Sequence, residues 1–488
     1  EEFSTQQKGK NKMETMHLNN LSYEEKYNLA TGIKTPAKIL AVLAQDIDPR
    51  IREAVAWNEN TPVEALVMLA KDVNIDVRCA VAKNKNTPVE LLAVLAQYED
   101  YWVRCAVAAN ENTSIDVLAM LAQDKMWRVR SAVAENKKTL VEVLAMLAED
   151  ESEVVRASVA RNKNTSADVL AMLAKDEDDD VRLAVAWNRN TSTNVLAMLA
   201  KDEDRDVRSK VATKGNTSAD VLAMLAKDED RDVRCAVARN KNTPIEILSV
   251  LAQDENRSVR EQVALNESTT ADVLALLAQD EKIGVRCAVA NNRNTPIGIL
   301  AVLAQDEDSW VRQAVAKNKR TPVKLLATLA QDEDYWVRCA VAGNRNTSAD
   351  VLAMLAKDEN RDVRWAVARN KNTPIEILTV LAQDENWSVR EQVALNESTT
   401  TELLAVLAND DVYDVRTAVA TNGNTSADVL AMLAKDEYII VRCAVAENEN
   451  TPKEALVTLS KDNNEWVSER AEEALKERKE RSKNNIER

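Results

Sequence analysis

Aromatic residues are scarce in this chain of 488 residues. They make up 3% of the sequence, and Phe3 is the single phenylalanine. There are also only seven glycines, whereas an ordinary globular domain has roughly 7% Gly and a core with several aromatic rings. The sequence is instead rich in Ala, Leu and Val. This composition predicts an all-α protein whose core consists of small aliphatic side chains.

Long apolar runs are missing too. No stretch approaches the 18 or so consecutive apolar residues that a membrane span requires, so we expect no membrane insertion. The net charge of -16 and the pI near 4.9 oppose a general affinity for nucleic acid or anionic membranes, which depends on Lys and Arg. We therefore expect a protein partner of basic or neutral character and no nucleic acid. A cytoplasmic location is expected, with a leader removed before Glu1 left open as an alternative.

Residues that carry enzymatic chemistry are equally few. The single histidine, His17, lies near the start with no partner placed by the sequence. No nucleophile elbow, phosphate loop, zinc motif or dinucleotide fingerprint occurs. We therefore predict no catalytic residue, no cofactor, no metal site and no enzymatic activity.

A 26-residue repeat fills most of the chain. If a Thr is taken as position 1, repeats begin at Thr35 and continue without insertion or deletion to Thr451. A fixed period of 20 to 50 residues is typical of solenoids, in which each repeat buries its apolar face against its neighbours. The register has these members: Thr35, Thr61, Thr87, Thr113, Thr139, Thr165, Thr191, Thr217, Thr243, Thr269, Thr295, Thr321, Thr347, Thr373, Thr399, Thr425 and Thr451.

Each repeat predicts two helices. The Thr is expected to be the N-cap of the first helix, with an acid such as Asp220 three residues later and Pro often following the Thr. The first helix has Leu at positions 6 and 9 and apolar residues at 5 and 8, which we expect to be buried. A polar turn follows, and then a shorter second helix with Val at 17 and 21. Asn then ends that helix, in a left-handed conformation or by bonds to neighbouring backbone, and Asn240, Asn266 and Asn292 are expected to form a ladder.

Arg at position 18 and Asp at position 12 recur in nearly every repeat. An Arg row could bind phosphate or carboxylate ligands, but the matching Asp row favours bidentate pairs within or between repeats. We predict a structural ladder, represented by Asp72, Arg78, Asp228, Arg234, Asp358 and Arg364. The six cysteines all occupy position 19, where we expect reduced thiols.

The positions that vary are 15, 16, 19 and 23 of the second helix. Trp and Arg recur there, and both are frequent at interface hot spots. The alternative is that the tryptophans cover the edge of a neighbouring repeat. The predicted partner-binding face consists of Trp102, Trp187, Arg239, Trp310, Trp336, Trp365 and Arg369.

The ends of the chain depart from the repeat. We expect an irregular leader at 1–20, an N-terminal capping helix at 21–34, the solenoid at 35–467 and a charged C-terminal capping helix or tail at 468–488.

The pattern TPxEVLxxLAxDxDxxVRxAVAxNxN closely resembles the leucine-rich repeat variant family, a bacterial relative of HEAT-like solenoids. The resemblance implies a right-handed superhelix in which an α-helix alternates with a shorter, partly 3-10 helix. Some members have an N-terminal cysteine cluster for an iron–sulfur centre. This chain has no cysteine before Cys79, so that cofactor is not expected.

The fold class predicted is therefore a right-handed α-solenoid of about seventeen two-helix repeats. The leading hypothesis is a non-enzymatic scaffold that lays a protein partner along the solenoid. The alternative is a structural protein that self-assembles into a filament or surface layer. A HEAT-like nucleic-acid-binding protein is a third hypothesis, which the acidity of the array disfavours.

Overall fold

The computed structural model describes residues 21–486, with side chains described to 480. The predicted leader at 1–20 and His17 lie outside the described residues. The helices run in pairs, and the chain divides into two compact units, Glu1–Asn240 and Lys241–Arg488. The structure confirms an all-α helical solenoid, with no strand in the described part of the chain.

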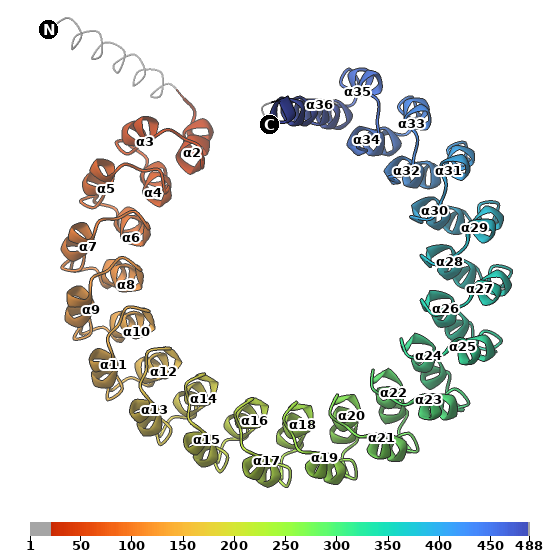
Figure 1. Ribbon diagram of the computed structural model, residues 1–488. Helices are drawn as coiled ribbons and strands as arrows, with labels where there is room; N and C mark the ends of the chain where they lie inside the picture. The colour runs from red at the N-terminus through yellow and green to blue at the C-terminus, as the bar shows by residue number, and fades with distance from the viewer. Residues whose placement is uncertain (1–20, 487–488) are drawn as a thin grey trace, which may run out of the picture. The chain divides into compact units, whose positions relative to one another are not determined.

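The N-terminal unit begins with α2 (Tyr23–Thr31) and continues with eight helix pairs (Figure 1). The first helices are α3 (Ala37–Leu43), α5 (Val63–Leu69), α7 (Val89–Leu95), α9 (Ile115–Leu121), α11 (Val141–Leu147), α13 (Ala167–Leu173), α15 (Thr193–Leu199) and α17 (Ala219–Leu225). The second helices are α4 (Pro49–Trp57), α6 (Ile75–Lys83), α8 (Tyr101–Ala109), α10 (Trp127–Glu135), α12 (Glu153–Arg161), α14 (Asp179–Trp187), α16 (Arg205–Thr213) and α18 (Arg231–Arg239).

The C-terminal unit continues the same alternation. Its first helices are α19 (Ile245–Leu251), α21 (Ala271–Leu277), α23 (Ile297–Leu303), α25 (Val323–Leu329), α27 (Ala349–Leu355), α29 (Ile375–Leu381), α31 (Thr401–Leu407), α33 (Ala427–Leu433) and α35 (Lys453–Leu459). Its second helices are α20 (Arg257–Leu265), α22 (Ile283–Asn291), α24 (Ser309–Lys317), α26 (Tyr335–Gly343), α28 (Arg361–Arg369), α30 (Trp387–Leu395), α32 (Tyr413–Thr421), α34 (Ile439–Glu447) and α36 (Glu465–Ile486).

The predicted helix lengths are reversed in the structure. Each first helix of a repeat has seven residues, as in α5, whereas the complete second helices have nine, as in α6, and both are α-helical. The first helix is short because position 2 is still extended and the chain turns after Leu at position 9. The second helix gains length because position 14 caps it directly, as when Asp230 accepts a hydrogen bond from the amide of Asp232.

The Thr of each repeat is not the N-cap. The residue at position 2, Pro or a short polar side chain in most repeats, takes that place, and Ser114 accepts a bond from the amide of Val117. The hydroxyl of Thr61 instead donates to the carbonyl oxygen of Val55 at the end of the preceding helix, at 2.6 Å. The buried Thr therefore satisfies a carbonyl that the preceding helix leaves open.

The Asn that ends the second helix forms the expected ladder but not a left-handed turn. No described residue outside glycine has a positive φ. Asn292 Nδ2 donates to the carbonyl oxygens of Ala264 and Asn266, at 2.7 and 3.0 Å. Each buried amide thus joins one repeat to the one before it, and the extended backbone at this position aims the side chain.

The core lies between the two helix rows of each unit. Leu at positions 6 and 9 and Val at 17 and 21 are almost fully buried, as in Leu222, Leu225, Val233 and Val237. Position 8 is not buried as expected: Val250 and Val302 are more than 60% exposed. The second helices of consecutive repeats pack closely, and the first helices lie farther apart, so position 8 faces outward (Figure 1).

Candidate functional site

The second helices form the inner row of each unit (Figure 1). Their Val side chains point to the core, which leaves positions 15, 16 and 23 facing the other way, whereas position 19 is buried or half-buried, as in Gln313 and Cys235. All nine tryptophans of the chain occupy these four positions. Eight of them are exposed: Trp57, Trp102, Trp127, Trp187, Trp310, Trp336, Trp387 and Trp466. Trp365 is half-buried.

An aromatic cluster lies on α8 and α10 in the N-terminal unit. The ring centroids of Tyr101 and Trp102 are 4.6 Å apart. The guanidinium carbon of Arg128 lies 5.5 Å from the Trp102 ring centroid and 5.0 Å from that of Trp127. Such cation–π contacts hold rings and charge together on an exposed surface. Sequence reasoning placed Trp102 in the partner-binding face but missed Arg128, although it lies at position 16 beside Trp127.

Other residues of the predicted face have similar surroundings. Lys210 Nζ lies 3.0 Å from the ring centroid of Trp187. In the C-terminal unit, Tyr335 and Trp336 have centroids 4.9 Å apart, and the guanidinium carbon of Arg369 lies 5.2 Å from the Trp365 ring. Trp310 is 68% exposed on the neighbouring helix. Arg239 is exposed at the end of α18. Each unit thus presents aromatic rings beside cations.

Arg and Asp of the predicted ladder pair between successive repeats. Arg52 donates from Nε and Nη2 to the Asp72 carboxylate, at 2.5 and 2.9 Å, and from Nη1 to the carbonyl oxygen of Asp46 in its own repeat. Equivalent pairs join Arg208 to Asp228, Arg338 to Asp358 and Arg364 to Asp384. Arg234 bonds the carbonyl oxygens of Asp228 and Glu229, and Arg78 pairs with Asp100. These Arg and Asp side chains bond to one another and to the backbone, and so they join successive repeats.

The ladder also sets the ionisation of its carboxylates. Burial opposes ionisation of Asp332, but bonds from Arg312 and from the amide of Asp334 outweigh it, and the pKa lies below its usual value. The pKa of Asp176 is lowered in the same way by Arg156 and Asp178. The carboxylates are therefore ionised parts of the framework.

Three of the position-19 thiols are held in the protonated form. Burial, reinforced by neighbouring carboxylates, raises the pKa of Cys105, Cys287 and Cys339 to about 11. Cys79 and Cys105, in neighbouring repeats, are free thiols. Among residues 21–480 no group of three His, Cys, Asp or Glu side chains is arranged to hold a metal ion.

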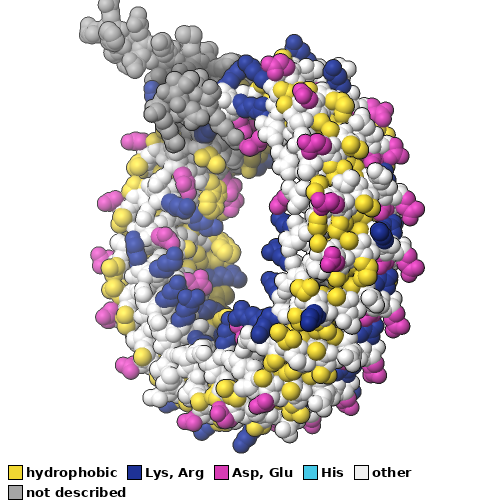
Figure 2. All heavy atoms as spheres, turned by 45° about the vertical axis from the view of Figure 1, so that its right-hand side comes forward, with side chains coloured by type: hydrophobic (Ala, Val, Ile, Leu, Met, Phe, Trp, Pro, Cys, Tyr) yellow, Lys and Arg dark blue, Asp and Glu magenta, His cyan; other side chains and the backbone are white. Residues whose placement is uncertain are grey.

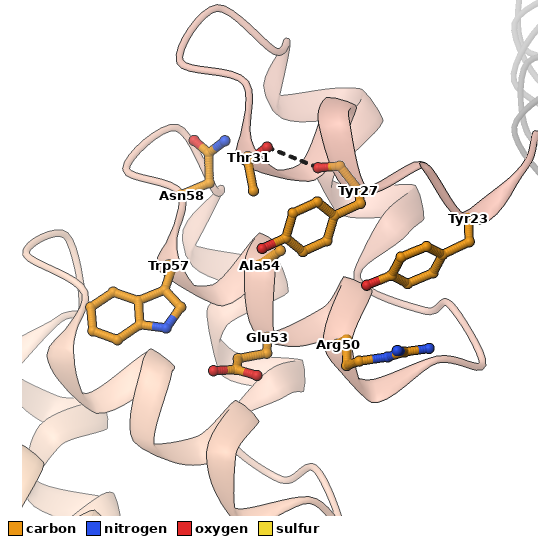
Figure 3. Close-up of a pocket in the computed structure, with 8 residues that line it drawn as sticks. All are labelled: Tyr23, Tyr27, Thr31, Arg50, Glu53, Ala54, Trp57 and Asn58. Atoms are coloured by element: carbon orange, nitrogen blue, oxygen red, sulfur yellow. Dashed lines mark hydrogen bonds between the residues drawn. The ribbon is translucent and has the colours of Figure 1, made fainter. Parts of the chain in front are cut away.

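A cavity of about 450 Å³ lies at the start of the N-terminal unit, between α2 and α4 (Figure 3). Tyr23 and Tyr27 stack with centroids 5.8 Å apart, and the guanidinium carbon of Arg50 lies 4.5 Å from the Tyr23 ring. Glu53 and Trp57 line the other side. The sequence analysis missed this cavity, although the i, i+4 spacing of the two tyrosines indicates that they share a helix face.

These features define the protein as an α-helical repeat solenoid. Residues 231–256 match the family model described as "Leucine rich repeat variant", which confirms the resemblance for that segment, one repeat in length. No curated protein matches the chain. No described helix has both the length and the apolar character needed to cross a bilayer.

The chain is similar to parts of several solved structures. One, described as a leucine-rich repeat variant with a novel repetitive structural motif, is 29% identical and covers 46% of this chain and 88% of its own, with a TM-score of 0.37. A chain from a structure of Kap95p and RanGDP is 12% identical to this chain. The match covers 95% of this chain and 84% of the other, with a TM-score of 0.37. A chain from the crystal structure of Kap121p bound to Ste12p is 11% identical to this chain. The match covers 93% of this chain and 56% of the other, with a TM-score of 0.34.

Proposed function

We propose that this chain is a non-enzymatic protein-interaction scaffold that binds a partner along the second-helix rows. The observation that carries the proposal is the placement of the tryptophans. Eight of the nine lie exposed at positions 15, 16 and 23 of the second helices, and the ninth, Trp365, is half-buried at position 19. Other repeats have Asp, Ser or Gly at the same positions, as in Asp232, Ser258 and Gly284, so the fold does not require Trp there.

Exposed Trp beside Arg is suited to binding because both side chains bury a large area on contact and supply directional interactions. In the C-terminal unit, Trp310, Trp336 and Trp365 lie in three consecutive repeats. A partner segment lying across these repeats would contact all three rings. We assign the selectivity of the scaffold to these positions and to Trp102 and Trp187 in the N-terminal unit.

The test exchanges each Trp for the residue that other repeats have at that position. The variant Trp102→Asp, Trp336→Asp and Trp365→Cys keeps residues that occur at positions 16 and 19 elsewhere, so it should fold normally. We expect partner capture in pull-downs to fall at least tenfold. A matched control replaces the outward Val250 and Val302 with Thr, which occupies the same first-helix position at Thr328. Unchanged capture by the Trp variant at unchanged thermal stability would reject the proposal.

A second candidate is self-assembly through the outer side, because the first helices there carry an exposed apolar stripe. Figure 2 shows hydrophobic side chains running along the outer side of the C-terminal unit. Its members at position 8 of that unit include Val250, Leu276, Val302, Met354, Val380, Val406 and Met432. Exposed apolar stripes of this kind often mark association surfaces. Light scattering and electron microscopy of the purified chain test it: filaments that Val302→Lys and Val380→Lys abolish would support self-assembly, and separate particles would oppose it.

A further inference from the structure

Position 25 lies in the turn after each second helix. Side chains at this position in adjacent repeats come within ion-pair distance of one another. Lys371 Nζ lies 2.8 Å from the Glu397 carboxylate one repeat away, and Lys137 lies 3.0 Å from Glu111 in the same relation. The Asn ladder fixes this register, because Asn344 donates to the carbonyl oxygen of Asn318 at 3.1 Å. Charges at position 25 of adjacent repeats therefore lie side by side.

In the C-terminal unit this row holds four consecutive cations, Arg293, Lys319, Arg345 and Lys371. The two outer ones are neutralised, because Arg293 pairs with Glu267 and Lys371 pairs with Glu397. The two inner ones, Lys319 and Arg345, have no ion pair within residues 21–480. Four further exposed cations lie within residues 295–372, at position 23 (Lys317 and Arg369), position 26 (Arg320) and position 4 (Lys324) of their repeats. The basic cluster consists of Lys317, Lys319, Arg320, Lys324, Arg345 and Arg369.

At this cluster, three residues differ from those that stabilise the other repeats. Arg320 replaces the Asn of position 26, which in other repeats donates across to the preceding turn, as Asn346 does to the carbonyl oxygen of Lys319 at 2.7 Å. Lys324 lies in the first turn of α25, where most repeats have Asp or Glu and the helix dipole favours an acid. Gly298 takes the acid's place in α23. All three changes make the surface more positive.

Steric need does not explain the glycines here. A Cβ on Gly298 or on Gly343 would meet no atom within 4 Å, and neither backbone has a positive φ. Gly within a helix lowers stability by about 0.5–1 kcal/mol relative to Ala. Gly343 occupies position 23 in the repeat between those of Lys317 and Arg369, so no side chain stands between these two cations of the cluster.

The cluster adjoins the tryptophan-bearing face. Lys317 Nζ donates to Gln313 Oε1 at 3.0 Å, and Gln313 Nε2 donates to the carbonyl oxygen of Trp336 at 3.5 Å. Arg369 lies over the Trp365 ring. In Figure 2, Lys and Arg side chains gather toward the side of each unit that the second helices line.

We infer that the basic cluster binds an acidic, extended segment of the partner protein, whose apolar side chains contact Trp310, Trp336 and Trp365. This inference rests on the proposed scaffold function. It differs from the expectation of a basic or neutral partner, because net charge does not describe this surface. Much of the acid lies in the turn between first and second helices, where Glu333 and Glu359 have side chains at least 90% exposed. Contact between opposite charges decides recognition at short range.

The experiment returns three residues to those of other repeats. The variant Gly298→Glu, Arg320→Asn and Lys324→Glu removes the excess charge, adds acids that suit the helix starts and restores the Asn bond. It should be at least as heat-stable as the parent chain. The probe is a fluorescein-labelled 14-residue peptide alternating Glu with Gly and containing two Leu. We expect fluorescence anisotropy to show at least tenfold weaker binding by the variant, and at least tenfold weaker binding by the parent chain between 50 and 500 mM salt.

Two controls make the result specific. The same peptide with Gln for Glu should bind at least tenfold more weakly, and Lys357→Glu, a charge reversal in the turn after α27, should leave affinity within twofold. Equal binding of Glu and Gln peptides would overturn the inference. Tighter binding of a 14-nucleotide single-stranded RNA would assign the cluster to nucleic acid, and dimerisation lost in the variant would assign it to a second copy; both outcomes overturn it. If the Trp variant still loses partner capture, the scaffold proposal survives that failure.

Discussion

The guanidinium carbon of Arg78 lies 5.5 Å from the centre of the Tyr98 ring, at the one repeat where position 12 lacks its Asp. Arg78 turns instead to Asp100, and its Nε is buried without a hydrogen-bond partner. A buried donor left without a partner costs about 1–3 kcal/mol. This repeat junction is therefore weaker than its neighbours.

Replacing Tyr98 with Asp should strengthen that junction. The carboxylate would accept bonds from Nε and Nη2 of Arg78, as Asp72 does from Arg52. We expect the free energy of unfolding in urea to rise by about 1 kcal/mol. The control Tyr98→Phe removes only the hydroxyl that donates to the Ala70 carbonyl oxygen at 2.9 Å, and it should lower stability. A less stable Tyr98→Asp chain would show that the ring packing outweighs the ion pair.

Replacing Asp332 with Asn tests an intact junction in the C-terminal unit. Asp332 accepts two bonds from Arg312, whose side chain is only 11% exposed. Asn lacks the charge and offers one acceptor oxygen, so the buried guanidinium of Arg312 loses its neutralising partner. We expect the free energy of unfolding to fall by about 2–3 kcal/mol. The surface change Glu333→Gln beside it should alter stability by less than about 0.5 kcal/mol.

Stability should depend on pH in the acid range. The pKa of Asp332, and likewise that of Asp124, Asp280 and Asp436, is lower in the folded chain than its usual value. Such a carboxyl contributes stability that is complete above its unfolded pKa of about 3.9 and is lost as pH falls through the folded value. We expect the urea midpoint to be level between pH 5 and 7 and to fall steeply below about pH 4. Asp332→Asn should show a shallower fall, and an equal slope would contradict the assignment.

Much of the fold could be predicted from the sequence because the repeat imposes it. Period, helix number and the Arg–Asp and Asn ladders follow from residues that recur at fixed spacing. The exact helix ends could not be predicted, because Thr61 bonds backward to Val55 and so leaves position 2 to cap the next helix. The exposure of Val302 depends on how far apart first helices lie, which periodicity within one helix does not reveal. The basic cluster was missed because the net charge of the whole chain averages the acidic turns between first and second helices with the cations that follow the second helices.

The Cys339 thiol should react slowly with alkylating reagents. Burial, with the nearby Asp362 and Asp358, raises the pKa of Cys339 to about 11, compared with about 9 for an ordinary thiol. The thiolate population at pH 7.5 is then about 100-fold smaller, and thiolate is the reactive species. We expect iodoacetamide to modify Cys339 at least tenfold more slowly than glutathione. Measuring rates from pH 7 to 10.5 by mass spectrometry separates low ionisation from poor access, because a thiol with a pKa of about 11 keeps gaining reactivity above pH 9, whereas a poorly accessible thiol with an ordinary pKa levels off there.

Lys214 is the one departure from Asn at position 24 between α4 and α34, and restoring Asn should stabilise the N-terminal unit. Lys214 Nζ donates to the carbonyl oxygen of Asn188 at 2.6 Å and so keeps part of the ladder. Burial lowers the pKa of Lys214, and Lys210 and Arg189 lower it further, which means that the folded chain disfavours its charge. Lys214→Asn would remove that charge and bond two carbonyls, as Asn188 does to Ala160 and Asn162. We expect the free energy of unfolding to rise by about 1 kcal/mol at pH 7.

The pH dependence of stability checks this assignment. Because the pKa of Lys214 is lower in the folded chain, the parent chain gains stability as pH rises toward the unfolded lysine pKa of about 10.4. The advantage of Asn should therefore shrink from pH 7 to 10. An advantage that is constant with pH would mean that the amide bonds alone account for it.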